Sequence, residues 1–593
     1  MDGRTEMGRR VKRAAGVLAA LACAATTPAL ANSSAAEYFR ARANATTVPE
    51  LLSKSERDWY RSLFAALEAK NWAQADMMLA ERPDGPLHQV ARAQYYLDAA
   101  SPRIELPAIE QWLAQGTHLP QSAQIAALGV KRGLTIMPGL PVPQQMVAQP
   151  SASRRVLPRS VEDGTMPADV KAAILDRIKS DDPTGARMLL DGVDAALSSA
   201  ARAEWRQRVA WSYYIENQDA AALAVAQTVG SGGSGAWVGE GDWTAGLAAW
   251  RLGDCAGAAE AFQRAAGSAH NIELTAASYY WASRALVRCR QPEKAAEQLR
   301  GAARLDETLY GMLAREALGQ ALPGERRSAD FDLADWQRLR DAPNVRTAVA
   351  LAEVGQDTLA DEVLRHEARI GTPSEYDALS RLARELGLPS TQLWMAANAP
   401  RGAKAQTALR YPAPRWQPTT GWQVDPALAF AHTLQESRFQ AGAVSPAGAR
   451  GLMQIMPSAA KDHAGRIGVA GTAADLNRPD VNLAFGQRHL AMLRDSGATR
   501  GLLPKIMAAY NAGLTPVTRW NSEVRDQGDP LLYMESIPYW ETRGYVGIVM
   551  RNYWMYERQA GGVSDSRIAL AQGMWPTFPE LAGGGAVRLT RAD

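Results

Sequence analysis

Cysteine is scarce in this chain, which has only three among its 593 residues. Cys23 lies within the first 31 residues, so Cys255 and Cys289 are the one pair in the rest of the sequence. Two scattered cysteines exclude the disulfide-dense scaffold that small secreted domains use. We expect both to be buried free thiols in helices, and the alternative is a single bridge between them.

Long apolar runs are lacking as well. Beyond residue 31, no uninterrupted apolar stretch reaches the roughly 18–20 residues that a membrane-spanning helix needs. We therefore expect no stable membrane insertion. With 47% apolar and 21% charged residues, the chain is too apolar for wholesale disorder, and its length predicts several domains.

The first 31 residues have the order of a secretory signal peptide. A basic stretch ends at Arg13, the apolar run Ala14–Ala25 follows, and Ala29-Leu-Ala31 is a small-x-small cleavage site. We predict that residues 1–31 direct export and are removed. The alternatives are an ordinary first helix, or a lipid-modified N-terminus at Cys23.

An excess of charge of one sign is absent. The formal net charge is +3, and the first 31 residues carry five basic and two acidic side chains, so their removal leaves the chain near neutrality. Nucleic-acid-binding proteins usually show a basic patch or stripe. We therefore expect no nucleic-acid partner.

The composition and apolar spacing of residues 35–400 are typical of an all-α protein. Ala, Leu, Glu and Arg dominate, with apolar residues recurring at spacings of three and four. Leu247–Phe262 and the segment that ends with Ala285–Leu299 follow one plan, and their cysteines lie 34 positions apart. This period is typical of tetratricopeptide-like helical hairpins, which bury their faces by stacking into a superhelix. Irregular helix packing with a chance resemblance is the alternative.

Three stretches rich in Pro, Gly, Ser or Gln mark boundaries or long loops. They are Met137–Arg159, Gly230–Gly241 and Pro400–Pro418. The predicted organisation is a signal peptide at 1–31, an α-superhelical region at 32–400, a linker at 401–420 and a further domain at 421–593.

Glu436 is the candidate catalytic residue. Asp425 is a good N-cap and Pro426 suits the first helical position, so the sequence predicts a helix with Glu436 at its far end. Most glutamates at helix ends are merely solvated. This one is followed by the Gly- and Pro-broken segment Ser445–Pro457, which can fold back over it. Loss of solvent would raise the pKa of Glu436 and make it a proton donor.

The residues around Glu436 resemble the soluble lytic transglycosylases, in a match that covers roughly Pro412–Tyr556. The helical region before it is similar to that family in layout only. Four ordered motifs carry the resemblance: Gln435-Glu-Ser-x-Phe439, Ser445-x-x-Gly-Ala-x-Gly-Leu-Met-Gln-Ile-Met-Pro457, Ala508-Ala-Tyr-Asn-Ala-Gly513 and Ile537-Pro-Tyr-Trp-Glu-Thr-Arg-Gly-Tyr-Val546.

The resemblance implies a lysozyme-like α domain that cuts the β-1,4 bond between N-acetylmuramic acid and N-acetylglucosamine in peptidoglycan. It implies a 1,6-anhydromuramoyl product, in whose formation Glu436 acts first as acid and then as base. One carboxyl group suffices when the substrate's own 6-hydroxyl is the nucleophile, whereas most glycosidases need two. The expected location is the periplasm, and the expected partner is the glycan strand, with cell-wall synthesis or remodelling proteins as further partners.

Motif positions also imply the substrate-binding residues. Ser445 and Gln454 would hydrogen-bond the saccharide, and Met456 and Tyr510 would form cleft walls. The last motif adds a polar pair, in which Glu541 lines the cleft and Arg543 meets an acidic peptide stem; an internal salt bridge between these two is the alternative. Two further expectations are a structural role for Asn511 and core positions for Tyr545, Val546, Val549 and Tyr553.

We expect no metal and no cofactor. His432, His463 and His489 are too isolated for a metal motif, and we expect each at the surface or behind the site. Two other functions stay open at this point. One is a muramidase that hydrolyses the same bond with water, and the other is a periplasmic helical scaffold with a glycan-binding terminal domain.

Overall fold

A computed structural model describes residues 35–44, 46–322, 331–579 and 581. The predicted signal peptide and Cys23 therefore lie outside the described residues. The described chain is all-α, as predicted, apart from two short antiparallel strands, β1 (Met146–Ala148) and β2 (Asn398–Pro400). Among the described residues, no helix is long and apolar enough to cross a membrane.

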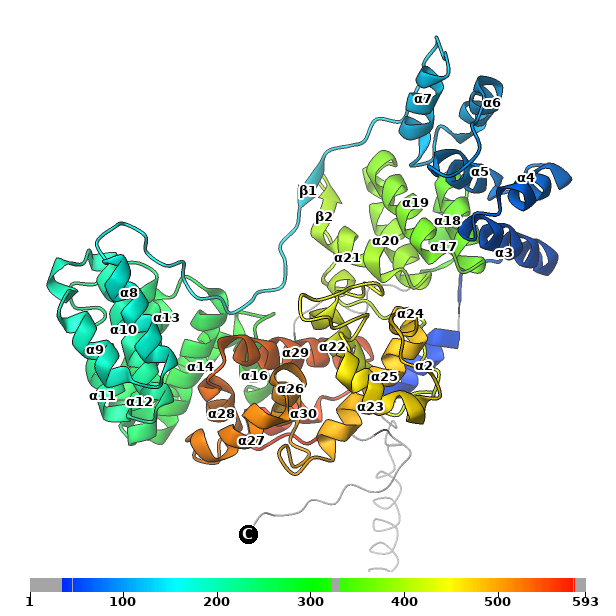
Figure 1. Cartoon of the computed structure of the whole chain (residues 1–593). Coiled ribbons are helices and arrows are strands. Elements are labelled where there is room, and N and C mark those ends of the chain that lie inside the picture. Colours follow the sequence, from blue (N-terminus) through cyan, green and yellow to red (C-terminus); the bar gives the residue numbers. More distant parts are fainter. Residues whose placement is uncertain (1–34, 45, 323–330, 580, 582–593) are drawn as a thin grey trace, which may run out of the picture.

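The helices between residues 54 and 397 form two groups rather than one. The first group joins two distant stretches of the chain around one hydrophobic core (Figure 1). Its members are α3 (Lys54–Glu68), α4 (Trp72–Glu81), α5 (His88–Leu97), α6 (Leu106–Gly116), α7 (Ser122–Lys131), α17 (Leu333–Leu339), α18 (Pro343–Glu353), α19 (Asp357–Ile370), α20 (Tyr376–Glu385) and α21 (Pro389–Ala397). Glu353 joins the two stretches by accepting hydrogen bonds from the backbone of Leu51 and Leu52.

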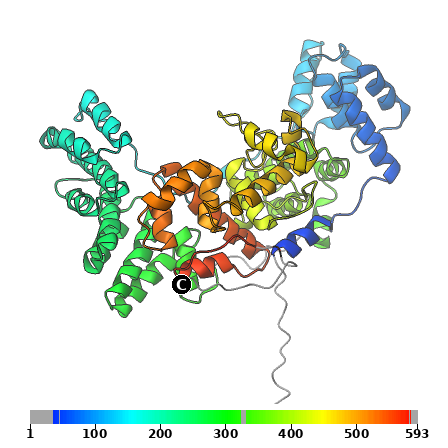
Figure 2. The same ribbon diagram turned by 60° about the horizontal axis from the view of Figure 1, so that its bottom comes forward.

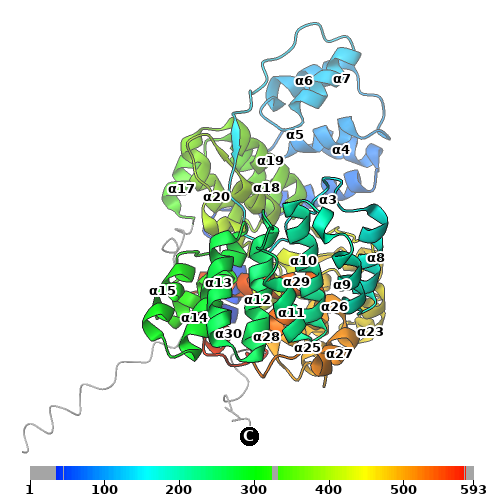
Figure 3. The ribbon, with the colours of Figure 1, turned by 90° about the vertical axis from the view of Figure 1, so that its left-hand side faces the viewer.

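The second group is the predicted stack of helical hairpins (Figure 3). Large aromatic side chains fill its centre, where Trp243, Phe262 and Trp281 meet with ring centroids 5.2–6.4 Å apart. The group consists of α8 (Ala168–Lys179), α9 (Pro183–Asp191), α10 (Ser199–Ile215), α11 (Asp219–Ala226), α12 (Trp237–Leu252), α13 (Cys255–Ser268), α14 (Ile272–Arg288), α15 (Pro292–Ala303) and α16 (Leu309–Ala317).

Cys255 and Cys289 form a disulfide, with Cα atoms 5.6 Å apart. The expectation of free thiols was therefore wrong. Cys255 begins α13, Cys289 is the C-cap residue directly after α14, and these two helices pack side by side. A hairpin of two helices of similar length brings the start of the first next to the end of the second, which sequence spacing alone does not measure.

The C-terminal helices lie between the two groups (Figure 2). They are α22 (Pro426–Glu436), α23 (Pro457–Ile467), α24 (Ala473–Leu476), α25 (Pro479–Arg494), α26 (Leu503–Ala512), α27 (Leu514–Glu523), α28 (Pro530–Ser536), α29 (Trp540–Gln559) and α30 (Asp565–Ala571). The long helix α29 contacts α22, α26 and α16, and it is mostly buried. The predicted domain boundaries stay predictions, although these helices share one core with the second group.

The described N-terminus belongs to the same core. Helix α2 (Ala35–Asn44) packs on α22, and the ring of Phe39 meets those of Phe430 and Tyr556 at 5.6 and 6.1 Å. A second connection is the extended segment 149–167, which runs from β1 to α8 past α29 (Figure 1). Arg551 of α29 holds this segment by donating to the carbonyl of Ser153.

Candidate active site

The helix that presents Glu436 is built as the sequence predicts. The side chain of Asp425 accepts a hydrogen bond from the backbone N–H of Ala427 at 2.9 Å, and Pro426 occupies the first turn. Glu436 is the last helical residue. Arg438 and Phe439 then adopt positive φ angles of 53° and 63°, which ends the helix and turns the chain.

The segment after α22 folds back against the end of the helix. Two isolated bridges, Val444 to Arg450 and Arg450 to Ile455, close a tight double turn. The hydroxyl of Ser437 donates to the carbonyl of Leu452 at 2.7 Å and ties this turn to α22. Leu452 and Met453 are completely buried there, so apolar atoms replace water on this side of the helix end.

Burial raises the pKa of Glu436 to about 7. A hydrogen bond from Tyr545 acts in the opposite direction, and the nearby charge of Glu541 adds to the rise. At neutral pH the carboxyl group is thus divided between its protonated and ionised forms. Such a group can give a proton in one step and take one in the next.

Tyr545 and His432 support the carboxyl group from behind. The Tyr545 hydroxyl donates to Oε1 of Glu436 at 2.6 Å, and Nδ1 of His432 lies 2.8 Å from the same hydroxyl oxygen. Because the hydroxyl proton points at Glu436, Nδ1–H of His432 is the donor in the second bond. Burial, and then the charge of His489, lower the pKa of His432 to about 3, so this imidazole is neutral.

Sequence reasoning missed the contact of Tyr545 with Glu436. It placed Tyr545 in the core, and the residue is indeed buried, but its hydroxyl also contacts Glu436. His432 is completely buried and lies behind the site, which is the second of the two places expected for it. It precedes Glu436 by four positions, a spacing that puts both side chains on one helix face and could have linked them. No sequence signal pairs either with Tyr545.

Ser445 and Gln454, the predicted saccharide ligands, both support the turn. The Ser445 hydroxyl accepts from the backbone N–H of Ala449 at 3.0 Å. Nε2 of Gln454 donates to the carbonyls of Ala443 and Gly451 at 3.2 and 2.9 Å. Within the described part of the chain, neither the Ser445 proton nor Oε1 of Gln454 has a partner, so both can still reach a ligand.

Tyr510 contacts the turn that covers the end of α22, and Met456 belongs to that turn; their role as cleft walls stays a prediction. The Tyr510 ring packs on His432 with centroids 4.6 Å apart and stacks on Tyr545 at 6.5 Å. Its hydroxyl donates to the carbonyl of Met453 at 2.7 Å and so does not bind Glu436. Met456 is 41% exposed, which leaves a flexible apolar surface beside the turn.

Glu541 and Arg543 form no salt bridge with each other in the described part of the chain, so the alternative of an internal pair does not hold. Residues two apart on a helix point in different directions. Glu541 is exposed, and its charge raises the pKa of Glu436. Arg543 instead donates to the carbonyl of Ile537 at 2.9 Å, and its guanidinium lies over the ring of Trp211 in α10. Arg543 thus joins the C-terminal helices to the second group.

The remaining predicted residues have structural roles. Asn511 accepts a hydrogen bond from Thr542 at 2.7 Å, which fixes α26 against α29 as expected. Nε2 of His463 and Nδ1 of His489 lie 3.3 Å apart, so these two histidines are neighbours rather than isolated. The described residues contain no cluster of three side chains able to hold a metal ion.

The buried carboxyl group also predicts a pH-dependent stability. The unfolded chain ionises Glu436 near its ordinary pKa of 4.5 and the folded chain only near 7, so the folded state binds more protons between these values. Folding stability therefore falls as pH rises through this window. Glu436→Gln should be more stable than the parent by about 3 kcal/mol at pH 8 and by little at pH 4.5. Urea unfolding at both pH values measures this difference.

The matched control for that measurement is Glu541→Gln, because Glu541 is exposed. This control should show a much smaller growth of the stability difference with pH, because it removes only the smallest of the contributions to the pKa of Glu436. A constant offset of Glu436→Gln at both pH values would contradict the burial of an ionisable group at position 436.

Known proteins share sequence and fold similarity with the region around this site. Residues 416–532 match the transglycosylase SLT domain family. The match contains α22 with Glu436, the turn that covers it and α26 with Tyr510, and it ends before the Ile537–Val546 motif. The resemblance to soluble lytic transglycosylases is thereby confirmed for this part of the chain.

Two curated relatives match a segment of similar length. The soluble lytic murein transglycosylase of Escherichia coli (strain K12) is 34% identical over 134 residues, which are 22% of this chain and 20% of the relative. The putative soluble lytic murein transglycosylase of Haemophilus influenzae is 37% identical over 136 residues, or 23% and 22% of the two chains. The matches thus span only about a fifth of the length of these relatives.

The fold is similar over a much longer stretch. The 70 kDa soluble lytic transglycosylase of Escherichia coli superposes with a TM-score of 0.51 at 16% identity, over 89% of this chain and 100% of that one. A structure described as the 70 kDa soluble lytic transglycosylase with bulgecin A gives a TM-score of 0.50 over the same shares. At this identity the comparison supports the all-α fold alone.

Proposed function

We propose that this chain is a peptidoglycan lytic transglycosylase, with Glu436 as its catalytic acid and base. The observation that carries the proposal is the shielded carboxyl group at the end of α22, whose pKa is raised to about 7 within the segment similar to the transglycosylase SLT domain. A carboxyl group in that state can protonate the oxygen that leaves from the β-1,4 bond.

In the proposed mechanism the proton leaves Glu436 and returns to it. As the bond between N-acetylmuramic acid and N-acetylglucosamine breaks, Glu436 gives its proton to the glycosidic oxygen. The resulting carboxylate is stabilised by the hydrogen bond from Tyr545. It then takes the proton of the muramoyl 6-hydroxyl, whose oxygen closes on C1 to give the 1,6-anhydro ring. An aligned intramolecular nucleophile has an effective molarity of roughly 10⁵ M or more, so water is not needed.

Hydrolysis of the same bond is the second candidate, and Glu541 is the observation that favours it. Hydrolytic glycosidases pair the acid with a second carboxylate, and the charge of Glu541 is near enough to raise the pKa of Glu436. In a muramidase, Glu541 would activate water or stabilise the positive charge at C1. In a transglycosylase it would only tune Glu436 and line the cleft.

The mass of the released fragments separates these candidates. Digestion of purified cell-wall sacculi should release muropeptides lighter by one water than the hydrolysed products, measured by mass spectrometry. Glu541→Gln should release the same anhydro fragments, because the substrate's own hydroxyl is the nucleophile. Fragments of hydrolysed mass, lost in Glu541→Gln, would instead establish the muramidase.

Export to the periplasm completes the proposal. It is supported by the order of blocks in residues 1–31 and by the disulfide between Cys255 and Cys289, since structural disulfides persist in oxidising compartments. We further propose that Ser445, Gln454, Met456 and Tyr510 bind the glycan strand around Glu436, with the helical groups on either side of it.

A further inference from the structure

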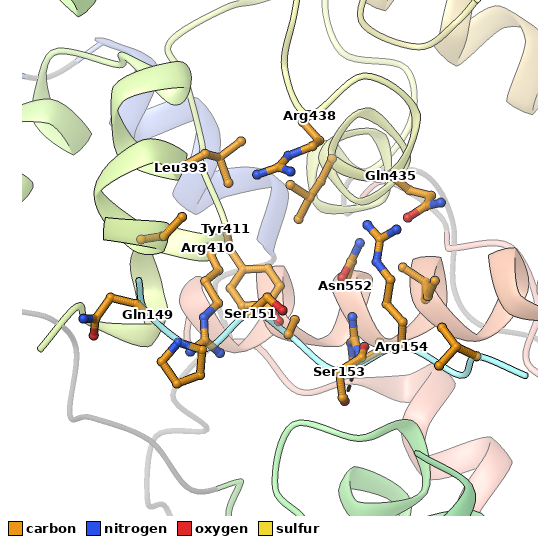
Figure 4. Close-up of a pocket in the computed structure, with 18 residues that line it drawn as sticks. Gln149, Ser151, Ser153, Arg154, Leu393, Arg410, Tyr411, Gln435, Arg438 and Asn552 are labelled. Carbon is orange, nitrogen blue, oxygen red and sulfur yellow. Dashed lines mark hydrogen bonds between the residues drawn. The ribbon is translucent and has the colours of Figure 1, made fainter. Parts of the chain in front are cut away.

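An open cavity of about 500 Å³ lies beside the candidate active site, where segment 149–156, helix α21, the end of α22 and helix α29 meet (Figure 4). Four arginines line it, and no acidic residue is among the side chains that do so. These arginines are Arg154, Arg410, Arg438 and Arg551. The cavity is therefore a positively charged space of the size that binds small molecules.

Two of the arginines are neutralised and two are not. Arg410 pairs with Glu307, and Arg551 pairs with Glu273 at 2.9 Å. Arg154 and Arg438 form no ion pair and no side-chain hydrogen bond with any other described residue. Partial burial, and then the charges of Arg551 and Arg438, lower the pKa of Arg154. Like charges thus face one another without a carboxylate between them.

Asn552 adds an independent sign of a ligand site. Its side chain points into the cavity, as Figure 4 shows, and the residue is only 3% exposed. The amide has no hydrogen-bond partner within the described part of the chain. Oε1 of the neighbouring Gln435 is likewise buried and without a partner. Buried polar groups in folded proteins are almost always satisfied. The N–H groups of the Asn552 amide can donate to a bound carboxylate, whereas Oε1 of Gln435 can only accept, from an N–H of the same ligand.

The cavity adjoins the reacting centre along two helices. Gln435 and Arg438 flank Glu436 at the end of α22. On α29, Asn552 follows Tyr545 by seven residues, so both lie on one helix face about 10 Å apart along the axis. A group attached to the reacting sugar by a short chain can therefore reach the arginines.

We propose that this cavity binds a free carboxylate of the peptide stem on the reacting muramoyl residue, with Arg154 and Arg438 as its ligands. This inference rests on the proposed function. The muramoyl residue carries its peptide through a lactyl group on C3, two ring atoms from the carbon that is attacked, and the stem bears free carboxylates. Arginine guanidinium matches a carboxylate through two parallel N–H donors. Contact with the acidic peptide stem, which was expected of Arg543, is thus made by Arg154 and Arg438 in this proposal.

Cleavage kinetics test the proposal with two substrates. Glycan strands with intact peptide stems are compared with strands from which an amidase has removed the stems. The double variant Arg154→Gln/Arg438→Gln should raise KM for stem-bearing strands about tenfold, with kcat changed less than twofold. On stripped strands the parent and the double variant should be equal. The matched control is Arg466→Gln, an exposed arginine of α23 outside the cavity, which should behave as the parent on both substrates.

Two kinetic outcomes would overturn the proposal. One is an unchanged KM of the double variant for stem-bearing strands. The other is an equal loss on both substrates, which would mean that the arginines serve the glycan or the fold. A parent protein inactive on both substrates would count against the proposed function instead, and the binding experiment below still tests the cavity.

Binding is measured without catalysis, by fluorescence anisotropy of a labelled synthetic stem tetrapeptide added to the full-length chain. The parent should bind it, the double variant should bind at least tenfold more weakly, and a tetrapeptide with amidated carboxyl groups should not compete. Inorganic phosphate at equal ionic strength should compete weakly. Equal binding by parent and double variant, or equal competition by the amidated peptide, would reject a carboxylate site.

Discussion

Glu436→Gln is expected to slow the cleavage of glycan strands by about 10²–10⁴-fold, because glutamine can neither give nor take the proton. The amide has nearly the shape of the carboxyl group, so glycan binding should stay close to that of the parent. The rate is measured as release of soluble muropeptides from purified sacculi, and binding as co-sedimentation with the same sacculi.

Glu541→Gln serves as the control for that loss, since it removes a carboxylate from the same cleft but not the proton that moves. It should retain most of the parent rate. Full activity in Glu436→Gln would reject the acid and base role of Glu436. If the parent itself only binds sacculi and never cuts them, the helical scaffold with a glycan-binding terminal domain becomes the better interpretation.

Loss of the Cys255–Cys289 bridge should lower the free energy of unfolding by about 3–4 kcal/mol, the chain-entropy value for a loop of 34 residues. The bridge ties the start of α13 to the end of α14, in the middle of the second helical group. The test is urea unfolding of Cys255→Ala/Cys289→Ala, followed by circular dichroism.

The parent protein in a thiol reductant provides the matching control, and its midpoint should move to that of the double variant. Reductant should leave the double variant unaffected. Equal midpoints for the oxidised parent and the double variant would mean that the bridge does not limit unfolding of this group, whose helices are also held by aromatic packing.

The sequence predicted the parts of the site that depend on neighbouring residues. Asp425 and Pro426 predicted the start of α22 correctly, because caps and first-turn prolines act locally. The glycines and prolines between Ser445 and Pro457 likewise predicted a turn that folds back. Tyr510 was placed at the wall through its motif, and the structure puts its ring against His432.

What the sequence did not predict depends on contacts between distant segments. Tyr545 contacts Glu436 although the two residues are 109 positions apart in the sequence. The sequence pattern around a helical tyrosine is the same whether or not its hydroxyl contacts a carboxylate. Arg543 was expected at the substrate and instead packs on Trp211, which belongs to the second group. Nothing in the local pattern marks which of two surfaces a residue on α29 will face.

The grouping of the helices around two cores also depends on contacts between distant segments. The sequence predicted one α-superhelical region over 32–400, whereas the described helices gather around two cores. Helix α2 joins the core of the C-terminal helices through Phe39, and α3–α7 pack with α17–α21. Helical periodicity identifies the apolar face of each helix, but several partners of equal apolarity can cover it.

The pH dependence of kcat/KM for glycan cleavage tests the central claim most directly, which is that a shielded Glu436 must be protonated to act. Above pH 7 the parent should lose activity about tenfold for each further pH unit, because its pKa is about 7. Tyr545→Phe removes a bond to the carboxylate and should move this decline to higher pH. Activity that stays level up to pH 9, or that declines already near pH 4.5, would contradict the account.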